Sequence, residues 1–182
     1  NNSIALSTSG ENVLSVDNNG TMQLYNIKSN KLIQTFRIES RKTTAVYFVP
    51  NSRMVATRHG DRKSICFWNM DTGDLLVTFH YLNNGFFWVT PPDAVAKHGW
   101  FWTDQPEIVI IGDSYDSMGG LSILTENSEQ RKVYFETYNR QDMVMNRLND
   151  FKSYEKDLMQ IQEKQKIRKK KEYIAFKENR LK

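Results

Sequence analysis

The sequence predicts an all-β fold of antiparallel four-stranded units that is followed by a helical tail. Three observations favour it: an internal repeat of about 43 residues, turn residues that divide each repeat into short β-prone runs, and a change of composition along the chain. All nine glycines and all four prolines precede residue 121. We therefore expect β-structure over residues 1–136 and a Lys-rich helical tail over residues 137–182.

The repeat is read from two pairs of segments that align at an offset of 43 residues. Residues 22–27 match residues 65–70, and residues 30–36 match residues 73–79. Upstream of these segments the offset is 42, and the extra residue falls in a hairpin turn, where an insertion costs little. The repeat predicts two units over about residues 3–43 and 44–86, and a third, divergent unit over residues 87–136.

The second unit shows its four β-prone runs most clearly. Turn residues such as Pro50 and Gly73 separate the runs, and no helical period fits the region. Short runs with turns at this spacing predict an antiparallel meander. The runs cover residues 45–49, 54–57, 64–69 and 75–79.

The repeat length and the end of the third run resemble the blades of WD-repeat β-propellers. Tyr25-Asn26 and Trp68-Asn69 stand where that family places its Trp-Asp dipeptide, with Asn in place of Asp both times. No Gly-His pair precedes the second unit, so we expect the family's buried Asp–His–Ser/Thr–Trp network to be incomplete. The resemblance covers about residues 3–125 and implies antiparallel four-stranded propeller blades.

The third unit is similar to the last blade of bacterial WD-repeat proteins, which carries a Trp-rich strand and a Thr-Pro turn. Residues 138–148 are similar to the Arg-Pro-Asp-Leu-Val-like segment that follows this blade, with Gln141 where Pro is usual. The resemblance implies the C-terminal portion of a larger protein. Three units cannot close a ring of four to eight blades, so an upstream segment or another chain is expected to supply the remainder.

The tail carries one apolar stripe at helical spacing. We expect this stripe to pack on the β-units of its own chain. A coiled coil or another protein contact is the alternative. A membrane-surface helix is the least favoured reading, because the most basic run and the most apolar run do not coincide. The stripe consists of Val144, Leu148, Phe151, Tyr154, Leu158 and Ile161.

Candidate interaction residues lie in two groups. An aromatic cluster contains Trp88, Trp100 and Trp102, which either fill the core or form a recognition surface. The tail contributes Phe151, Leu158, Lys169, Lys170 and Lys171. Residues 140–182 hold 13 Lys and Arg against 7 Asp and Glu, so the basic run is a solvated face, a site for an acidic protein, or a nucleic-acid or lipid contact.

The sequence predicts no enzyme. Ser114 follows a β-prone run and a Gly-Asp pair, which resembles the nucleophile block of Gly-Asp-Ser hydrolases. Such a serine needs a general base, and no histidine follows it. No ligand set for zinc or calcium is present, so we expect no metal or cofactor. Cys66, the single cysteine, is expected to be a small core residue.

A non-catalytic protein–protein interaction scaffold is therefore the function that the sequence predicts, with protein partners that include the missing blades or an upstream domain. A nucleic-acid-associated factor that uses the basic tail is the alternative, and hydrolysis at Ser114 is a remote one. The single cysteine fits a reducing, cytoplasmic location. No run approaches the roughly 20 apolar residues of a membrane-spanning helix.

Overall fold

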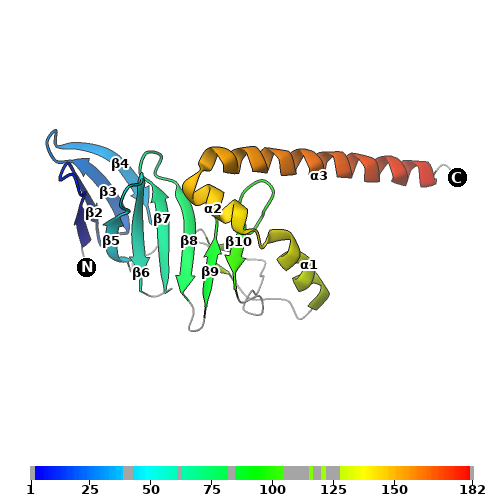
Figure 1. Ribbon diagram of the computed structural model, residues 1–182, viewed down its shortest axis with the longest axis horizontal. Helices are drawn as coiled ribbons and strands as arrows, with labels where there is room; N and C mark the ends of the chain where they lie inside the picture. Colours follow the sequence, from blue (N-terminus) through cyan, green and yellow to red (C-terminus); the bar gives the residue numbers. More distant parts are fainter. Residues whose placement is uncertain are drawn as a thin grey trace.

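A computed structural model describes most of the chain, and the fold consists of two antiparallel sheets followed by three helices (Figure 1). The expectation of a β-rich body with a C-terminal helical extension is confirmed. The described residues are 3–38, 43–60, 63–81, 85–104, 115–116, 120–121 and 128–180.

The first sheet has four strands in the order β1-β2-β3-β4, and the second has six in the order β10-β9-β8-β7-β6-β5. The first sheet is built from β1 (Ser3–Leu6), β2 (Asn12–Val16), β3 (Thr21–Asn26) and β4 (Lys31–Arg37). The second is built from β5 (Thr43–Phe48), β6 (Met54–His59), β7 (Ser64–Asn69), β8 (Leu75–Tyr81), β9 (Phe86–Val89) and β10 (Phe101–Thr103). A small hairpin pairs β11 (Tyr115–Asp116) with β12 (Gly120–Leu121).

The two repeat units share an irregularity as well as a strand order. The register between the third and fourth strands shifts after Leu24 in the first unit and after Phe67 in the second, which are 43 residues apart. A β-bulge at the same place bends both sheets alike. Just beyond each bulge an Asn side chain closes the turn: the Oδ1 atom of Asn26 accepts from the amide of Ser29, and that of Asn69 accepts from the amide of Asp71. A neutral amide oxygen serves this purpose, so Asn can replace Asp here.

The third unit does not begin a separate sheet within the described residues. Strand β9 pairs with β8, and β10 pairs with β9, so both extend the sheet of the second unit. The expected boundary at residue 136 falls inside the first helix, α1 (Ser128–Tyr138). The stretch 105–114, which contains Ser114, lies outside the described residues.

The two sheets pack face to face around a shared core. Leu24, Phe36 and their neighbours on the inner face of the first sheet are fully buried against the second sheet. The ring of Phe36 meets Trp68 edge-on at 6.5 Å. The amide of Val46 on β5 also donates to Ser3 Oγ on β1 at 3.2 Å, which joins the first strands of the two units. Burial of each large apolar side chain contributes about 1.5–3 kcal/mol.

A buried polar chain crosses the second sheet. The indole of Trp68 donates to Thr57 Oγ1 at 3.0 Å, and Thr57 Oγ1 lies 2.8 Å from His59 Nε2. Thr43 Oγ1 lies 3.4 Å from the other ring nitrogen of His59. All four side chains are buried, so this chain links β5, β6 and β7 by hydrogen bonds that water does not weaken.

The helical tail is divided into α2 (Gln141–Asn149) and α3 (Phe151–Arg180), where the sequence predicted a single helix. Asp150 causes the break. Its carboxylate accepts from the amide of Ser153 at 3.2 Å and from Ser153 Oγ at 2.7 Å, which caps the start of α3. The apolar stripe continues across the break, because all of its residues except Phe151 pack in one cluster against the second sheet.

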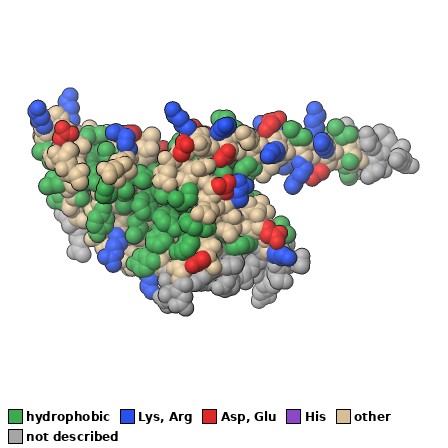
Figure 2. Space-filling model, in the orientation of Figure 1, with side chains coloured by type: hydrophobic (Ala, Val, Ile, Leu, Met, Phe, Trp, Pro, Cys, Tyr) green, Lys and Arg blue, Asp and Glu red, His purple; other side chains and the backbone are tan. Residues whose placement is uncertain are grey.

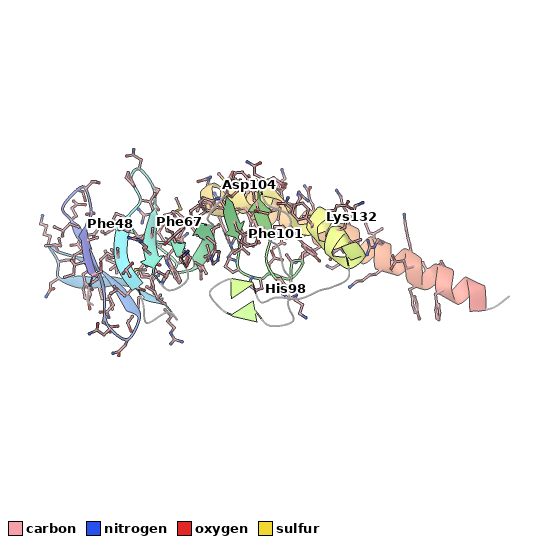
Figure 3. The ribbon with its side chains drawn as sticks, turned by 90° about the horizontal axis from the view of Figure 1, so that it is seen from below. Phe48, Phe67, His98, Phe101, Asp104 and Lys132 are labelled. Carbon is pink, nitrogen blue, oxygen red and sulfur yellow. The ribbon has the colours of Figure 1, made fainter. Side chains whose placement is uncertain are left out.

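The helices cover two parts of the second sheet. Helix α1, marked by Lys132 in Figure 3, lies near Phe101 of β10. The ring of Phe135 on α1 lies 5.7 Å from the ring of Phe101. Helices α2 and α3 pack on Leu76 and Val77 of β8. The C-terminal half of α3 extends away from the body (Figure 1). None of the described helices is long and apolar enough to span a membrane.

Candidate functional site

The candidate site is an apolar surface on the second sheet, on the side opposite the first sheet. Strand register places two rows of side chains on this side, which we call the open face. Figure 2 shows hydrophobic side chains gathered over the strands of the body. The open face consists of the row Arg58, Ile65, Phe79, Trp88 and Trp102 and the row Tyr47, Ala56, Phe67 and Val77. Helices α2 and α3 pack on one end of it, at Val77, Trp88 and Trp102.

Aromatic rings organise the open face around Trp88. The ring of Trp88 lies 4.5 Å from Phe79 and stacks on Phe67 at 5.7 Å. Trp102 meets Phe86 edge-on at 4.9 Å. These rings are half-buried, and Tyr47 is 50% exposed. A contiguous apolar surface of this kind is typical of a binding site rather than of a free protein surface.

Trp100 does not belong to the open face. It is 2% exposed, and its indole donates to Asp93 Oδ2 at 2.7 Å. Of the three tryptophans that the sequence singled out, Trp88 and Trp102 are partly buried on the open face, and Trp100 is buried in the cluster against which they pack.

Asp93 is the acceptor that joins the loop before β10 to helix α3. Its Oδ1 accepts from the amides of Val95 and Ala96, each at 2.7 Å. Its Oδ2 accepts from the Trp100 indole and from the hydroxyl of Tyr154 at 2.5 Å. One carboxylate thus satisfies four donors, and this arrangement determines where α3 leaves the body.

The loop that presents Asp93 requires a glycine at residue 99. Gly99 has φ +80°, and a Cβ there would lie 2.0 Å from the carbonyl oxygen of Thr90. The close approach allows Thr90 and Trp100 to exchange hydrogen bonds: the amide of Thr90 donates to the Trp100 carbonyl, and the amide of Trp100 donates to Thr90 Oγ1.

Tyr154 is fully buried beneath this loop. Burial, together with the hydrogen bond and negative charge of Asp93, raises the pKa of its hydroxyl far above the ordinary value of a tyrosine. The folded chain therefore keeps the Tyr154 proton at a pH at which the unfolded chain loses it.

The raised pKa of Tyr154 predicts a loss of stability in strong alkali. The unfolded chain ionises Tyr154 above about pH 10, whereas the folded chain does not, so the free energy of unfolding falls as the pH rises beyond that value. Urea unfolding between pH 8 and about pH 11 checks this. Tyr154→Phe is the control, and it should show a shallower decline. Equal slopes in both proteins would contradict the assignment.

Arg147 pins α2 to the bulge of the second sheet. Its Nε donates to the Leu76 carbonyl at 2.9 Å and its Nη2 to the Leu75 carbonyl at 3.2 Å. Its guanidinium also lies 5.0 Å from the centre of the Tyr154 ring and 5.5 Å from that of Phe151. These contacts satisfy carbonyl groups that the bulge would otherwise leave without a regular ladder partner.

The candidate residues of the tail fall into two places. Leu158 packs against the second sheet, and Phe151 is 42% exposed with its ring stacked on Tyr154. Lys169, Lys170 and Lys171 lie on the projecting half of α3, where every described side chain from 163 to 176 is exposed. The structure therefore does not bring the basic run and the aromatic cluster together.

The other chemical groups that the sequence raised are a metal-ligand set, Cys66 and Ser114. No group of three or more His, Cys, Asp or Glu side chains gathers in the described part of the chain in a way that could hold a metal ion. Cys66 is fully buried, with its Sγ 3.6 Å from Thr78 Oγ1, as expected for a small core residue. Ser114 lies outside the described residues.

Sequence reasoning missed Asp93 and Arg147. The Pro-Pro-Asp order before small residues is a local signal for a turn in which an Asp side chain accepts from the amides that follow it. No local signal predicts that Trp100 and Tyr154 share this acceptor, since Tyr154 is 61 residues away. The partners of Arg147 on β8 are 71 and 72 residues away.

Comparison with known proteins adds little to this description. No protein-family model matches the chain, and no curated protein matches it. Among solved structures 231 chains match. One is the crystal structure of the computationally designed Ika8 protein, with a TM-score of 0.35 and 20% identity over 49% of this chain and 30% of that chain. This chain thus spans less than a third of that protein, and a similarity at this TM-score carries no argument.

Proposed function

We propose that the chain is a non-catalytic protein–protein interaction scaffold, the C-terminal portion of a larger WD-repeat β-propeller. Two units with equivalent registers and bulges support the repeat architecture. Their face-to-face packing, with the first strands β1 and β5 joined by the Val46–Ser3 hydrogen bond, is the arrangement that neighbouring blades need. The buried chain from Trp68 through Thr57 to His59 supports it too, since the family uses these residue types together.

The open face is the observation that carries the scaffold proposal. Ring geometry holds Phe67, Phe79 and Trp88 in fixed positions on a rigid sheet, so little side-chain entropy is lost when a partner covers them. Exposed aromatic side chains are the usual anchors of protein interfaces. The partner is a protein with an apolar contact surface.

A peptide-display selection on the purified chain tests this proposal. We expect the enriched peptides to be rich in apolar residues. Their affinity for the chain should fall at least about tenfold, or 1.4 kcal/mol, when Tyr47 on the open face is replaced by Lys. Ile27→Lys is the matched control, because Ile27 is 47% exposed in a turn away from that face. Peptides that bind both variants equally, or no enrichment at all, would contradict the proposal.

The projecting half of α3 favours a second candidate, a nucleic-acid-associated factor. Lys169, Lys170 and Lys171 are exposed there, and the ion pairs of neighbouring side chains join Lys166 to Glu163 and Arg168 to Glu172. The ammonium groups of Lys169, Lys170 and Lys171 are available to bind phosphates. Basic and acidic side chains alternate along α3 in Figure 2, which weakens this candidate.

A salt titration of binding to duplex DNA separates the two candidates. Each phosphate that a Lys neutralises adds about −0.9 to the slope of log K against log salt concentration. If α3 binds DNA, replacing Lys169, Lys170 and Lys171 by Gln should reduce that slope by about 3. We expect instead that the scaffold shows weak binding whose slope the triple variant leaves unchanged.

A further inference from the structure

Two sheet faces have no second sheet packed on them in the described part of the chain. One is the open face of the second sheet. The other is the outer face of the first sheet, where Ile4, Leu6 and Leu32 are 69%, 64% and 49% exposed. Strand register aligns Leu6, Val13, Tyr25 and Leu32 in one row across this outer face.

The internal repeat relates the open face to a face that is already packed. In the first two strands of each unit the offset is 42, and in the last two it is 43. When these offsets are added to the residue numbers of the inner face of the first sheet, they give the residue numbers of the open face of the second sheet. Leu14, Met22, Leu24 and Phe36 correspond in order to Ala56, Ile65, Phe67 and Phe79.

The same offsets relate the outer face of the first sheet to the covered face of the second. Val13, Tyr25 and Leu32 correspond in order to Val55, Trp68 and Leu75. Val55 and Trp68 belong to the shared core, and Leu75 packs against it. The chain therefore forms one contact between two types of face, and one further face of each type has no sheet packed on it in the described residues.

We propose that a second copy of this chain covers these faces, with the open face of one copy packed on the outer face of the next. This contact continues the interface between the two sheets by the same repeat operation. It is a head-to-tail contact, so copies add in one direction until the assembly closes or stops. The inference rests on the proposed stacking of repeat units.

The helices leave room for this contact. Helices α2 and α3 pack on the part of the open face that carries Val77, Trp88 and Trp102, and the contact between copies would use the remaining part, over β5 to β8. Ile65, Phe67 and Phe79 are half-buried and belong to none of the buried clusters among the described residues. Their counterparts Met22, Leu24 and Phe36 are 0% exposed against the second sheet.

The repeat operation also specifies which residues should meet between copies. Within the chain, Phe36 contacts Trp68 edge-on. The equivalent contact between copies joins Phe79 of one copy to Tyr25 of the next. The Val46–Ser3 hydrogen bond has no such counterpart, because the residue equivalent to Ser3 is Ala45, whose side chain has no acceptor.

Sedimentation of two single-face variants tests the inference. Leu6→Lys blocks the outer face, and Tyr47→Lys blocks the open face. Both side chains are at least half exposed, so these changes leave the core intact. We expect the unaltered chain to associate as its concentration rises. Each variant alone should be monomeric, because one of its two faces is blocked. A mixture of the two variants should form a 1:1 dimer through the face that each one keeps. The control Met159→Lys should associate like the unaltered chain, because Met159 is 67% exposed on α3 and belongs to neither face.

Each other result overturns the inference. A contact between like faces would leave one variant dimeric by itself, and the mixture would gain nothing. An unaltered chain that stays monomeric, or variants that associate as it does, would exclude this contact even if the open face still binds selected peptides. That combination separates its failure from failure of the scaffold proposal.

A photo-crosslink provides a measurement without a blocking charge. A benzophenone amino acid at residue 25, in a mixture of unlabelled and ¹⁵N-labelled copies, should crosslink to the β8 segment around Phe79 of a differently labelled copy. A crosslink confined to one copy would show that another segment of the same polypeptide covers the outer face, and it would overturn the proposal.

Discussion

Replacement of Asp93 by alanine is expected to lower the free energy of unfolding by about 3 kcal/mol or more. The change removes the acceptor of four hydrogen bonds. It leaves the Trp100 indole and the Tyr154 hydroxyl buried without that acceptor, and each buried donor left unsatisfied costs about 1–3 kcal/mol. Urea unfolding followed by tryptophan fluorescence measures the loss.

The same variant should release helix α3 from the body before the sheets unfold. Limited proteolysis should therefore cut the Asp93→Ala variant first between α2 and α3, because the Tyr154 hydroxyl near the start of α3 has lost its hydrogen-bond acceptor. Asp74→Ala is the control, since Asp74 is an exposed turn residue and should lose less than about 0.5 kcal/mol. Similar losses in both variants would show that Asp93 does not anchor α3.

Truncation of Phe36 to alanine is expected to cost about 3–5 kcal/mol, the usual range for a buried phenylalanine. Phe36 is 0% exposed between the two sheets and contacts Trp68. Its loss opens a cavity at the interface that holds the repeat units together. Thermal and urea unfolding of Phe36→Ala measure the effect.

Phe79→Ala is the matched comparison, because Phe79 occupies the equivalent position in the second unit. It is half-buried on the open face and contacts Trp88 on its own sheet. In the monomeric Leu6→Lys background we expect it to cost about 1 kcal/mol, in line with a contact that covers only part of the ring. A loss as large as that of Phe36→Ala would show that the open face is already packed.

The sequence predicted the two repeat units because their signals are local. Alternating side chains and turn residues at a fixed spacing identify each strand, and the structure has strands at all four runs of the second unit. The expected core role of Cys66 is confirmed by its burial. The WD-repeat assignment itself stays a prediction, since no compared family tests it.

The third unit was harder to interpret because sheet membership is not a local property. The run around Phe87 and Trp88 was predicted to be β-structure, and it is. Whether such a run pairs with the preceding strand or begins a new sheet depends on the length and path of the connection. Strand β9 pairs with β8, so the expected separate blade is not seen in the described residues.

In the candidate site, too, the sequence predicted which residues matter but not which of them are buried. Trp88, Trp100 and Trp102 are equivalent as a sequence pattern, yet Trp100 is buried and the other two lie on the open face. Strand register decides this for Trp88 and Trp102, which are directly paired. Trp100 precedes the strand and turns toward Asp93.

The amino-acid sequence by itself determined the repeat, the order of its strands, the turns between them, and a basic helical tail with an apolar stripe. These features depend on residues close together along the chain. The tertiary structure alone decided which sheet face is covered, where the tail divides, and how Asp93 and Arg147 hold it. Those choices depend on partners as far as 72 residues apart, which pack together only after the sheets have formed.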